Sequence, residues 1–541
     1  MRLRTCFLCC LCLFTISLSL TAQTTKPKII VGIVVDQMRW DYLYRYQSKY
    51  GNQGFKRLLS EGYSFDNCAI PYTPAVTAAG HTCIYTGGVP STHGIVGNDW
   101  VDRDGGYTMY CTRDSTEQTI GSNSALGKMS PRNLLSTTIG DELRLATNFK
   151  SRVFGIALKD RGGILPAGHS ANGAFWMDDS SGNWISSTYY YNALPAWVTT
   201  LNQRRGIDSF MRMNWIPILP MNAYTESTAD ETTYEKPIYH EKNLTFPHAY
   251  ASQVGKNYYS FRQSPYGNTY SFDFAKSLIL EEQLGKRGET DMLCLSLSAT
   301  DYISHRFGPN SIEVEDTYLR LDRDLGAFLS FLDKQYGKNN YLVFLSADHG
   351  APQSPAYMLD HKLPGGSLWG YNLRGELNTM LQKIFGVPNI VKVVYEYQVY
   401  LDANNKDLKG LNVQSVTDTI IGYLRAKKEV MNAFAYSNWA NVILPVEFKE
   451  KLAKGYNYKR SGDIQFILKP QYTDVVNEGT EHGTMYNYDA HIPLIWFGQG
   501  ITKGRTHRPV YMTDIAPTLA AMLNIQVPSA SIGTPLTEIV K

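Results

Sequence analysis

Six side chains of types that commonly bind metal ions are spread over most of this 541-residue sequence. They are three aspartates and three histidines: Asp36, Asp301, His305, Asp348, His349 and His482. A mixture of carboxylates and imidazoles suits a borderline-soft divalent ion such as Zn²⁺. Six ligands make two sets of three, enough for two catalytic ions that keep positions open for substrate. Taken singly, each residue could instead be a helix cap or a hydrogen-bonded structural histidine.

Two of these residues, Asp301 and His305, are four positions apart. If the segment after Ser298 is helical, both side chains lie on one face and can bind the same ion. Thr77 is the candidate nucleophile. Pro74 restrains the chain before it, and the small residues after it suit the start of a helix. The N-terminus of a helix favours negative charge near it. A hydroxyl beside a divalent ion loses its proton more easily. The alternative is that Thr77 is only an N-cap.

Three further side chains could bind an anion. The run RVFGIALKDR, residues 152–161, predicts an extended segment in which Lys159 and Arg161 point to one side and Asp160 to the other. The arginine fork suits a tetrahedral oxyanion, and the lysine acts as a point charge. Asn98, in the turn sequence GNDW, could donate an amide hydrogen to a phosphoryl oxygen. Each of these motifs in isolation also fits a solvated turn.

The elements that must position these residues are apolar runs typical of strands buried on both faces. Three of the runs lead directly to Asp36, Asp301 and Asp348, and carboxylates at such exits are where open α/β sheets bind ligands. A fourth run follows His482. The runs cover residues 28–35, 292–298, 341–345 and 492–497.

Helical patterns separate the strands, at residues 52–61, 311–335 and 513–523. Alternating strands and helices predict an α/β fold with a doubly wound, mostly parallel central sheet flanked by helices. Residues 170–272 and 355–478 break the pattern and are predicted to be insertions that cap the sheet. The predicted organisation is a signal peptide at residues 1–22 and one catalytic domain at residues 23–541 with these two insertions.

The composition of the chain limits the classes of protein to which it can belong. Hydrophobic residues make up 43% of the chain, and the net charge of +3 gives no broad field for binding nucleic acid. Residues 1–22 have the positive start, short apolar run and small residue of a signal peptide, with an uncleaved anchor as the alternative. We expect an exported, periplasmic or secreted protein without a stable membrane span.

Four cysteines remain after the predicted leader is removed: Cys68, Cys83, Cys111 and Cys294. They are either paired as disulfides in one of three ways or buried as free thiols.

Together these motifs closely resemble the PafA-type alkaline phosphatases of the alkaline phosphatase superfamily. The resemblance runs from about residue 27 to the end, and includes VDQMRWDY from residue 35, SADHG from residue 346 and FGPNSIEVEDTY from residue 307. It implies an alkaline phosphatase-like fold and a nucleophilic Thr77. It also implies that Asn98, Lys159 and Arg161 hold phosphoryl oxygens, the last two standing where some members keep a third metal ion. The implied ligands are Asp36, Asp348 and His349 for one zinc, and Asp301, His305 and His482 for the other.

The expected activity is hydrolysis of phosphate monoesters through a phosphothreonine intermediate. The nearest alternative is a nucleotide pyrophosphatase or phosphodiesterase on the same two-zinc scaffold. A sulfatase is excluded, because Thr77 cannot be matured to an aldehyde and no C/S-x-P-x-R context surrounds Cys83. A further alternative is a non-catalytic exported protein that binds zinc or phosphate. The natural ester and the oligomeric state stay open at this point.

Overall fold

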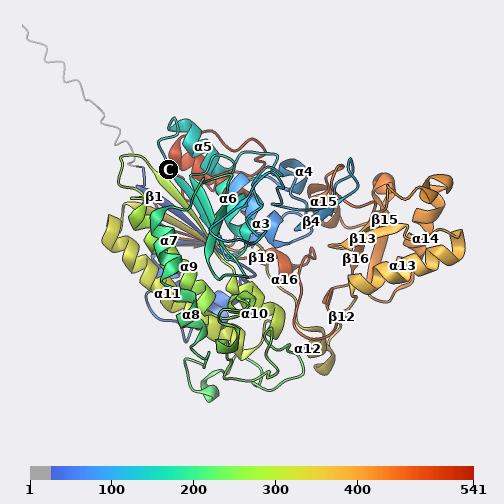
Figure 1. Ribbon diagram of the computed structural model, residues 1–541, viewed down its shortest axis with the longest axis horizontal. Coiled ribbons are helices and arrows are strands. Elements are labelled where there is room, and N and C mark those ends of the chain that lie inside the picture. Colours follow the sequence, from blue (N-terminus) through green and yellow to red (C-terminus); the bar gives the residue numbers. More distant parts are fainter. Residues whose placement is uncertain (1–25, 541) are drawn as a thin grey trace, which may run out of the picture.

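The computed structural model describes residues 26–540, so the predicted signal peptide lies outside the described residues. A ten-stranded sheet crosses the middle of the molecule in the order β20-β2-β19-β11-β1-β10-β7-β8-β9-β6 (Figure 1). Its strands, in chain order, are β1 (Ile29–Val35), β2 (Tyr63–Phe65), β6 (Thr119–Ile120), β7 (Val153–Ile156), β8 (Gly173–Met177), β9 (Trp184–Ser187), β10 (Asp291–Leu297), β11 (Tyr341–Ser346), β19 (Leu494–Gly498) and β20 (Gly504–Thr506).

The centre of the sheet is parallel. β1 lies between β10 and β11, and Ile33 is in register with Leu295 on one side and Leu345 on the other. β7 and β8 continue the parallel set beyond β10. Every residue of β1, β10 and β11 is buried, as their continuous apolar runs predict. The predicted mostly parallel α/β sheet is therefore confirmed, and β1, β10 and β11 all end at the same edge.

The fourth predicted strand differs in direction. β19 pairs antiparallel with β11, and β2 pairs antiparallel with β19. Apolar composition reports burial on both faces but carries no information about strand direction. His482 therefore precedes a strand that runs opposite to the three strands followed by the aspartates.

Helices cover both faces of this sheet (Figure 1). The three helical patterns of the sequence correspond to α2, α11 and α17, and the apolar stripe of α11 is buried. One group of contacting helices consists of α2 (Phe55–Glu61), α9 (Tyr266–Glu281), α10 (Ala299–Phe307) and α11 (Ile312–Tyr336). The other consists of α3 (Thr77–Thr86), α4 (Pro90–His93), α5 (Ile139–Ala146), α6 (Asp160–Ala167) and α17 (Ile515–Leu523).

A second sheet lies to one side of the main body, within the predicted insertion at residues 355–478 (Figure 1, orange). Its four strands are all antiparallel, in the order β13 (Val391–Tyr395), β14 (Gln398–Leu401), β16 (Ile464–Leu468) and β15 (Val430–Ala435). The helices α13 (Gly370–Phe385) and α14 (Val413–Ala426) pack on it. Leu377, Ile420 and Phe466 belong to a hydrophobic core separate from that of the main sheet.

The other predicted insertion, residues 170–272, begins with β8 and β9, which pair within the central sheet. It continues through α7 (Ala196–Gln203) and α8 (Gly206–Met211) into a largely irregular segment before α9. The boundaries of the two insertions stay a prediction. The remaining short elements are α1 (Tyr42–Arg45), α12 (Pro355–Asp360), α15 (Val446–Gly455), α16 (Asn487–Ala490), β3 (Cys68–Ala69), β4 (Asp99–Val101), β5 (Thr108–Tyr110), β12 (Gly366–Ser367), β17 (Tyr472–Thr473), β18 (His491–Ile492) and β21 (Val510–Tyr511).

The four cysteines outside the leader are all unpaired and buried. Burial raises the pKa of each thiol, which makes them unreactive at neutral pH. None of the helices within residues 26–540 has the length and apolar character needed to cross a membrane.

Candidate active site

Strand ends bring the predicted metal ligands together. Asp36 follows β1, Asp348 follows β11, and Asp301 lies in the first turn of α10, which follows β10. The six residues form two groups of three, and in each group one ligand atom from every residue lies within 4.8 Å of the others. One group is Asp36, Asp348 and His349, and the other is Asp301, His305 and His482. This grouping is the one that the resemblance implied.

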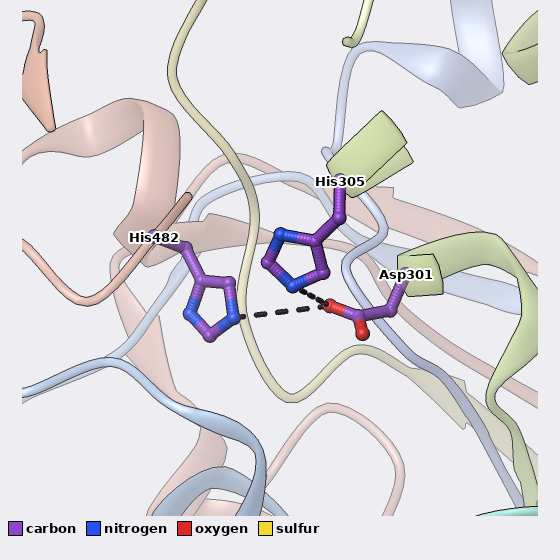
Figure 2. Close-up of side chains that lie close together, drawn as sticks. All are labelled: Asp301, His305 and His482. Carbon is purple, nitrogen blue, oxygen red and sulfur yellow. Dashed lines mark ion pairs between the residues drawn. The ribbon is translucent and has the colours of Figure 1, made fainter. Parts of the chain in front are cut away.

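The second group shows how local structure positions the ligands (Figure 2). Asp301 and His305 lie one turn apart on α10, and His305 Nε2 is 3.1 Å from Asp301 Oδ1. His482 Nε2 is 3.8 Å from the same oxygen. Both imidazole rings therefore turn a nitrogen toward one carboxylate from different parts of the chain.

The three histidines are oriented alike by backbone carbonyls. Nδ1 of His305 lies 2.7 Å from the oxygen of Thr480, and Nδ1 of His482 lies 2.9 Å from that of Ala75. Nδ1 of His349 is 3.1 Å from the oxygen of Gly350. Donation from Nδ1 fixes the tautomer in which Nε2 carries a lone pair, and metal-binding histidines commonly use this arrangement. All three Nε2 atoms are thus available as ligands.

The first group contains a buried carboxylate oxygen without a hydrogen bond. Asp36 Oδ1 is in this state, whereas Asp36 Oδ2 and Asp348 Oδ2 lie 2.7 Å from Lys159 Nζ and 3.1 Å from His81 Nδ1, respectively. His349 Nε2 lies 3.6 Å from Asp36 Oδ1 and 3.5 Å from Asp348 Oδ2. Burial and the charge of Asp348 raise the pKa of Asp36 well above its usual value. Neighbouring carboxylates in a buried site need compensating positive charge, and one Lys159 ammonium faces three buried aspartates here. The donors of both groups therefore fit divalent metal ions.

Thr77 is the first residue of α3, and Val76 occupies the N-cap position. The buried Thr77 hydroxyl oxygen lies 3.4 Å from His349 Nε2 and 3.4 Å from Lys159 Nζ. Gly80, in the same helix, allows close packing, because a Cβ at that position would lie 2.3 Å from the backbone oxygen of Asp348. The helix start therefore holds the candidate nucleophile directly beside the first ligand group.

The predicted extended segment through Arg161 is wrong. β7 ends at Ile156, and α6 begins at Asp160, so that Lys159 is the N-cap residue and Arg161 lies in the first helical turn. An acidic residue in the first turn interacts favourably with the helix dipole, which helps to start the helix there. Both cations nevertheless lie near Thr77, since Lys159 Nζ is 3.4 Å from its hydroxyl oxygen and Arg161 lines the same cavity.

Lys159 connects the two ligand groups. Its Nζ is 2.7 Å from Asp36 Oδ2 and 2.5 Å from Asp301 Oδ2, and the side chain is almost completely buried. Although burial would lower the pKa of Lys159, the charges of Asp301 and Asp36 raise it above its usual value. The ammonium group therefore stays charged beside Thr77.

A cavity of about 450 Å³ opens onto Thr77, and Asn98 and Arg161 line it together with the second ligand group. Asn98 Oδ1 accepts a hydrogen bond of 3.1 Å from the N–H of Ala78, which fixes the amide plane. Arg161 donates to the hydroxyl of Tyr110 over 3.0 Å. The opposite wall comes mainly from the predicted insertion at residues 355–478 and consists of Trp369, Glu396, Tyr397, Asp474 and Glu481.

Three residues of the site have no role in the sequence-based analysis. Gln37 joins the ligand groups, since its side-chain amide donates to Asp301 over 2.8 Å and its backbone N–H to Asp348 over 3.1 Å. The ring of His81 lies 3.1 Å from Asp348 Oδ2. Glu396 accepts a 2.8 Å hydrogen bond from the Asn98 N–H. Gln37 is inside the VDQMRWDY motif and His81 lies four residues after Thr77, whereas no sequence signal distinguishes Glu396.

Comparisons with known proteins agree with this geometry. Residues 30–491 match the family model described as type I phosphodiesterase / nucleotide pyrophosphatase. Alkaline phosphatase PafA of Elizabethkingia meningoseptica is 47% identical over 526 residues, covering 96% of each chain. The crystal structure of a PafA alkaline phosphatase superposes with a TM-score of 0.93, covering 96% of this chain and 99% of the other.

Two other relatives are equally similar in sequence. Alkaline phosphatase PhoV of Synechococcus elongatus is 46% identical over 516 residues, covering 95% of this chain and 93% of the relative. A Myroides odoratus protein named calcium-transporting ATPase is 46% identical over 535 residues, covering 98% of each chain. The chain therefore belongs to the type I phosphodiesterase / nucleotide pyrophosphatase family and, within it, to the PafA-type alkaline phosphatases.

Proposed function

We propose that the chain is an exported, zinc-dependent phosphomonoesterase that releases inorganic phosphate through a covalent phosphothreonine at Thr77. The observation that carries the proposal is the position of the Thr77 hydroxyl, 3.4 Å from both His349 Nε2 and Lys159 Nζ and on the wall of the cavity. The proposed ligands of one Zn²⁺ are Asp36, Asp348 and His349, and those of the other are Asp301, His305 and His482. Mixed carboxylate and imidazole donors support zinc.

Bound zinc would supply Lewis acidity that favours an ionised nucleophile and offsets charge on the leaving oxygen. The Thr77 oxygen attacks phosphorus in line, so that a new P–O bond forms to Thr77 and the ester P–O bond breaks, releasing the alcohol. Water then attacks the phosphothreonine, and phosphate leaves while Thr77 regains its proton. We assign Asn98, Lys159 and Arg161 to the non-bridging phosphoryl oxygens, where donors stabilise the transition-state charge.

The side chains proposed to bind the phosphoryl oxygens favour phosphate monoesters over diesters as substrates. A monoester presents three non-bridging oxygens with two negative charges, and two cationic side chains and one amide lie at this site to bind them. The alternative, a nucleotide pyrophosphatase or phosphodiesterase, has one oxygen fewer to bind. The names of the PafA and PhoV relatives also favour the monoesterase.

Kinetic measurements on a matched pair of substrates distinguish a monoesterase from a diesterase. An aryl phosphate monoester and a methyl aryl diester with matched leaving groups are compared on the zinc-loaded enzyme. We expect kcat/KM for the monoester to be higher by at least about two orders of magnitude. A diester rate equal to or above the monoester rate would identify the enzyme as a diesterase.

Export is supported by the signal-peptide pattern of residues 1–22. Fractionation of cells that express the full chain tests it. The expected result is a shortened chain, beginning near residue 23, outside the cytoplasm. Full-length protein retained in the membrane fraction would favour an uncleaved anchor.

A further inference from the structure

The aromatic ring of Tyr302 packs against the lysine at the centre of the site. Tyr302 follows Asp301 in α10, the helix that also carries His305 (Figure 2). The ammonium nitrogen of Lys159 lies over the face of the Tyr302 ring, 4.9 Å from the ring centroid. An ammonium group is attracted by the negative face of an aromatic ring, most strongly where water is excluded. Lys159 is 1% exposed, so this contact is desolvated.

The ring gives Lys159 a restraint that its acidic partners do not supply. The ammonium nitrogen lies 2.7 Å from Asp36 and 2.5 Å from Asp301, and it donates to the Thr77 hydroxyl oxygen over 3.4 Å. A lysine is a point charge on a flexible stem of four carbons. Carboxylates attract such a group without limiting where along their oxygens it settles. A planar ring packed against the nitrogen limits the positions that are open to it.

Arg262 holds the Tyr302 ring in place. Its Nη1 donates to the Tyr302 hydroxyl over 3.1 Å, and its Cζ lies 5.5 Å from the ring centroid. The other nitrogens of the same guanidinium are also engaged, Nε with Asp179 over 2.6 Å and Nη2 with the backbone oxygen of Met177 over 3.0 Å. A buried planar fork that uses all three nitrogens is fixed in orientation. The hydroxyl end of the tyrosine is therefore anchored.

The support behind the ring comes from the predicted insertion at residues 170–272. Arg262 lies in the short 3₁₀ helix η3 (Tyr259–Gln263), which contacts α10. From the same element, Tyr259 packs edge-on against the Tyr302 ring, with centroids 5.8 Å apart and an interplanar angle of 85°. None of the cavity-lining residues that the structure describes belongs to this insertion. The insertion therefore reaches the site indirectly, through Tyr302.

We propose that Tyr302 is a positioning residue for Lys159, supported through Arg262 by the insertion at residues 170–272. The ring face and the guanidinium fork behind it hold the ammonium group where it reaches Thr77. Tyr302 does not line the cavity, so it acts through Lys159 and not on the substrate. Its effect on turnover rests on the proposed function, in which Lys159 binds a non-bridging phosphoryl oxygen.

A double-mutant cycle tests whether Tyr302 acts through Lys159. In the mature, zinc-loaded enzyme, Tyr302→Leu should lower kcat/KM for an aryl phosphate monoester by about 5- to 30-fold, because the ring face is lost. The same substitution in a Lys159→Ala background should change kcat/KM by less than about twofold. Tyr302→Phe keeps the ring face and should retain kcat/KM to within about threefold. Equal losses from Tyr302→Leu in both backgrounds would overturn the proposal.

Two further variants separate positioning from general destabilisation. Tyr423→Leu removes a ring that lies at the same distance, 4.9 Å, from Lys427 at the end of α14, and it should leave kcat/KM unchanged. Arg262→Gln keeps the ring but removes the fork behind it. It should lower kcat/KM for the monoester by about threefold only when Lys159 is present, and it carries the test if Tyr302→Leu does not fold. A loss that persists without Lys159 would count against the proposal.

Crystal structures of the zinc-loaded Tyr302 variants give a readout that is independent of turnover. The Lys159 side chain should keep its position in Tyr302→Phe and should shift, or take several conformations, in Tyr302→Leu. An unmoved Lys159 in Tyr302→Leu would refute the positioning role. A displaced Lys159 with unchanged monoester turnover would support that role and would contradict instead the proposed contact of Lys159 with the phosphoryl group.

Discussion

The imidazole rings of His349 and His482 are stacked, with centroids 3.5 Å apart and an interplanar angle of 17°. The two rings belong to different ligand groups, so this contact joins the groups. Burial lowers the pKa of both histidines, and for His482 the neighbouring His349 adds to the effect. Two stacked, buried rings resist simultaneous protonation, and neutral imidazole is the form that binds a metal ion. The contact therefore favours the neutral form of both imidazoles, which is the form that the proposed metal binding needs.

Removing the Thr77 hydroxyl should abolish turnover while leaving the zinc content intact. We expect Thr77→Ala to lower kcat by about three orders of magnitude or more, because no oxygen remains to form the covalent intermediate. Thr77→Ser should keep substantial activity. Acid quenching followed by mass spectrometry should detect phosphorylated residue 77 only in the wild type and the serine variant. A phosphorylated residue elsewhere would refute the assignment.

Loss of His482 should remove one metal ion. His482→Ala deletes a ligand of the second group and leaves the first group complete, so elemental analysis should find about one zinc per chain instead of two. Treatment with a chelator should remove both ions and the activity, and added Zn²⁺ should restore them. His507→Ala, at an exposed histidine, is the control. Two retained zinc ions in His482→Ala would exclude this ligand set.

Arg161 should discriminate between substrates. Within residues 26–540, Lys159 forms ion pairs with Asp36 and Asp301 and Arg161 forms none with them, so removing Arg161 reports on substrate binding more directly. Arg161→Ala should lower kcat/KM for a monoester by about 10²–10³-fold and for a matched diester much less. Lys159→Ala should show the same preference. Arg113→Ala, at an exposed arginine, should change neither, and equal losses for both esters would contradict the proposed phosphoryl contacts.

Gly80 should tolerate no side chain. The added Cβ of Gly80→Ala would lie 2.3 Å from the backbone oxygen of Asp348 and must displace the strand exit that carries two ligands. We expect a loss of about 1–3 kcal/mol in unfolding free energy, together with weaker zinc binding. Gly422→Ala, in a helix with open space around the position, should instead stabilise the protein by about 0.5–1 kcal/mol. Similar stability changes at the two sites would refute the packing argument.

Glu396 should make stability depend on pH. Burial raises the pKa of Glu396 from 4.5 to about 8, against the lowering effect of the hydrogen bond from Asn98. Its contribution to stability is therefore complete below pH 4.5 and is lost as the pH rises through about 8. Relative to the wild type, Glu396→Gln should gain stability across this range in denaturation experiments. Glu450→Gln, at an exposed side chain, should show no such trend, and parallel curves for wild type and Glu396→Gln would disprove the argument.

The central sheet and the closeness of the six candidate ligands follow from the sequence for a local reason. Asp36 and Asp348 directly follow buried strands, so the carboxyl ends of the parallel strands place them together. Asp301 and His305 depend only on a helix of two turns. These relationships need one strand or one helix each, and the continuous apolar runs identify those elements.

The other features of the site depend on contacts between segments far apart in the sequence, which local sequence patterns do not predict. The helix start at Asp160 competes with a strand-like run, and the glycines that follow hide the helical pattern. The wall residue Glu396 reaches Asn98 from another sheet, and no periodicity reports which distant segment packs there. The direction of β19 is likewise a matter of chain topology, because either direction buries the same side chains.

The second sheet packs around its own core, yet the turn between β13 and β14 supplies Glu396 and Tyr397 to the cavity, and Trp369 before α13 lines it too. The candidate metal ligands and part of the cavity wall thus belong to separately packed parts of one chain. Mutations in the second sheet can reshape the space for the alcohol group while the metal ligands and Thr77 keep their positions.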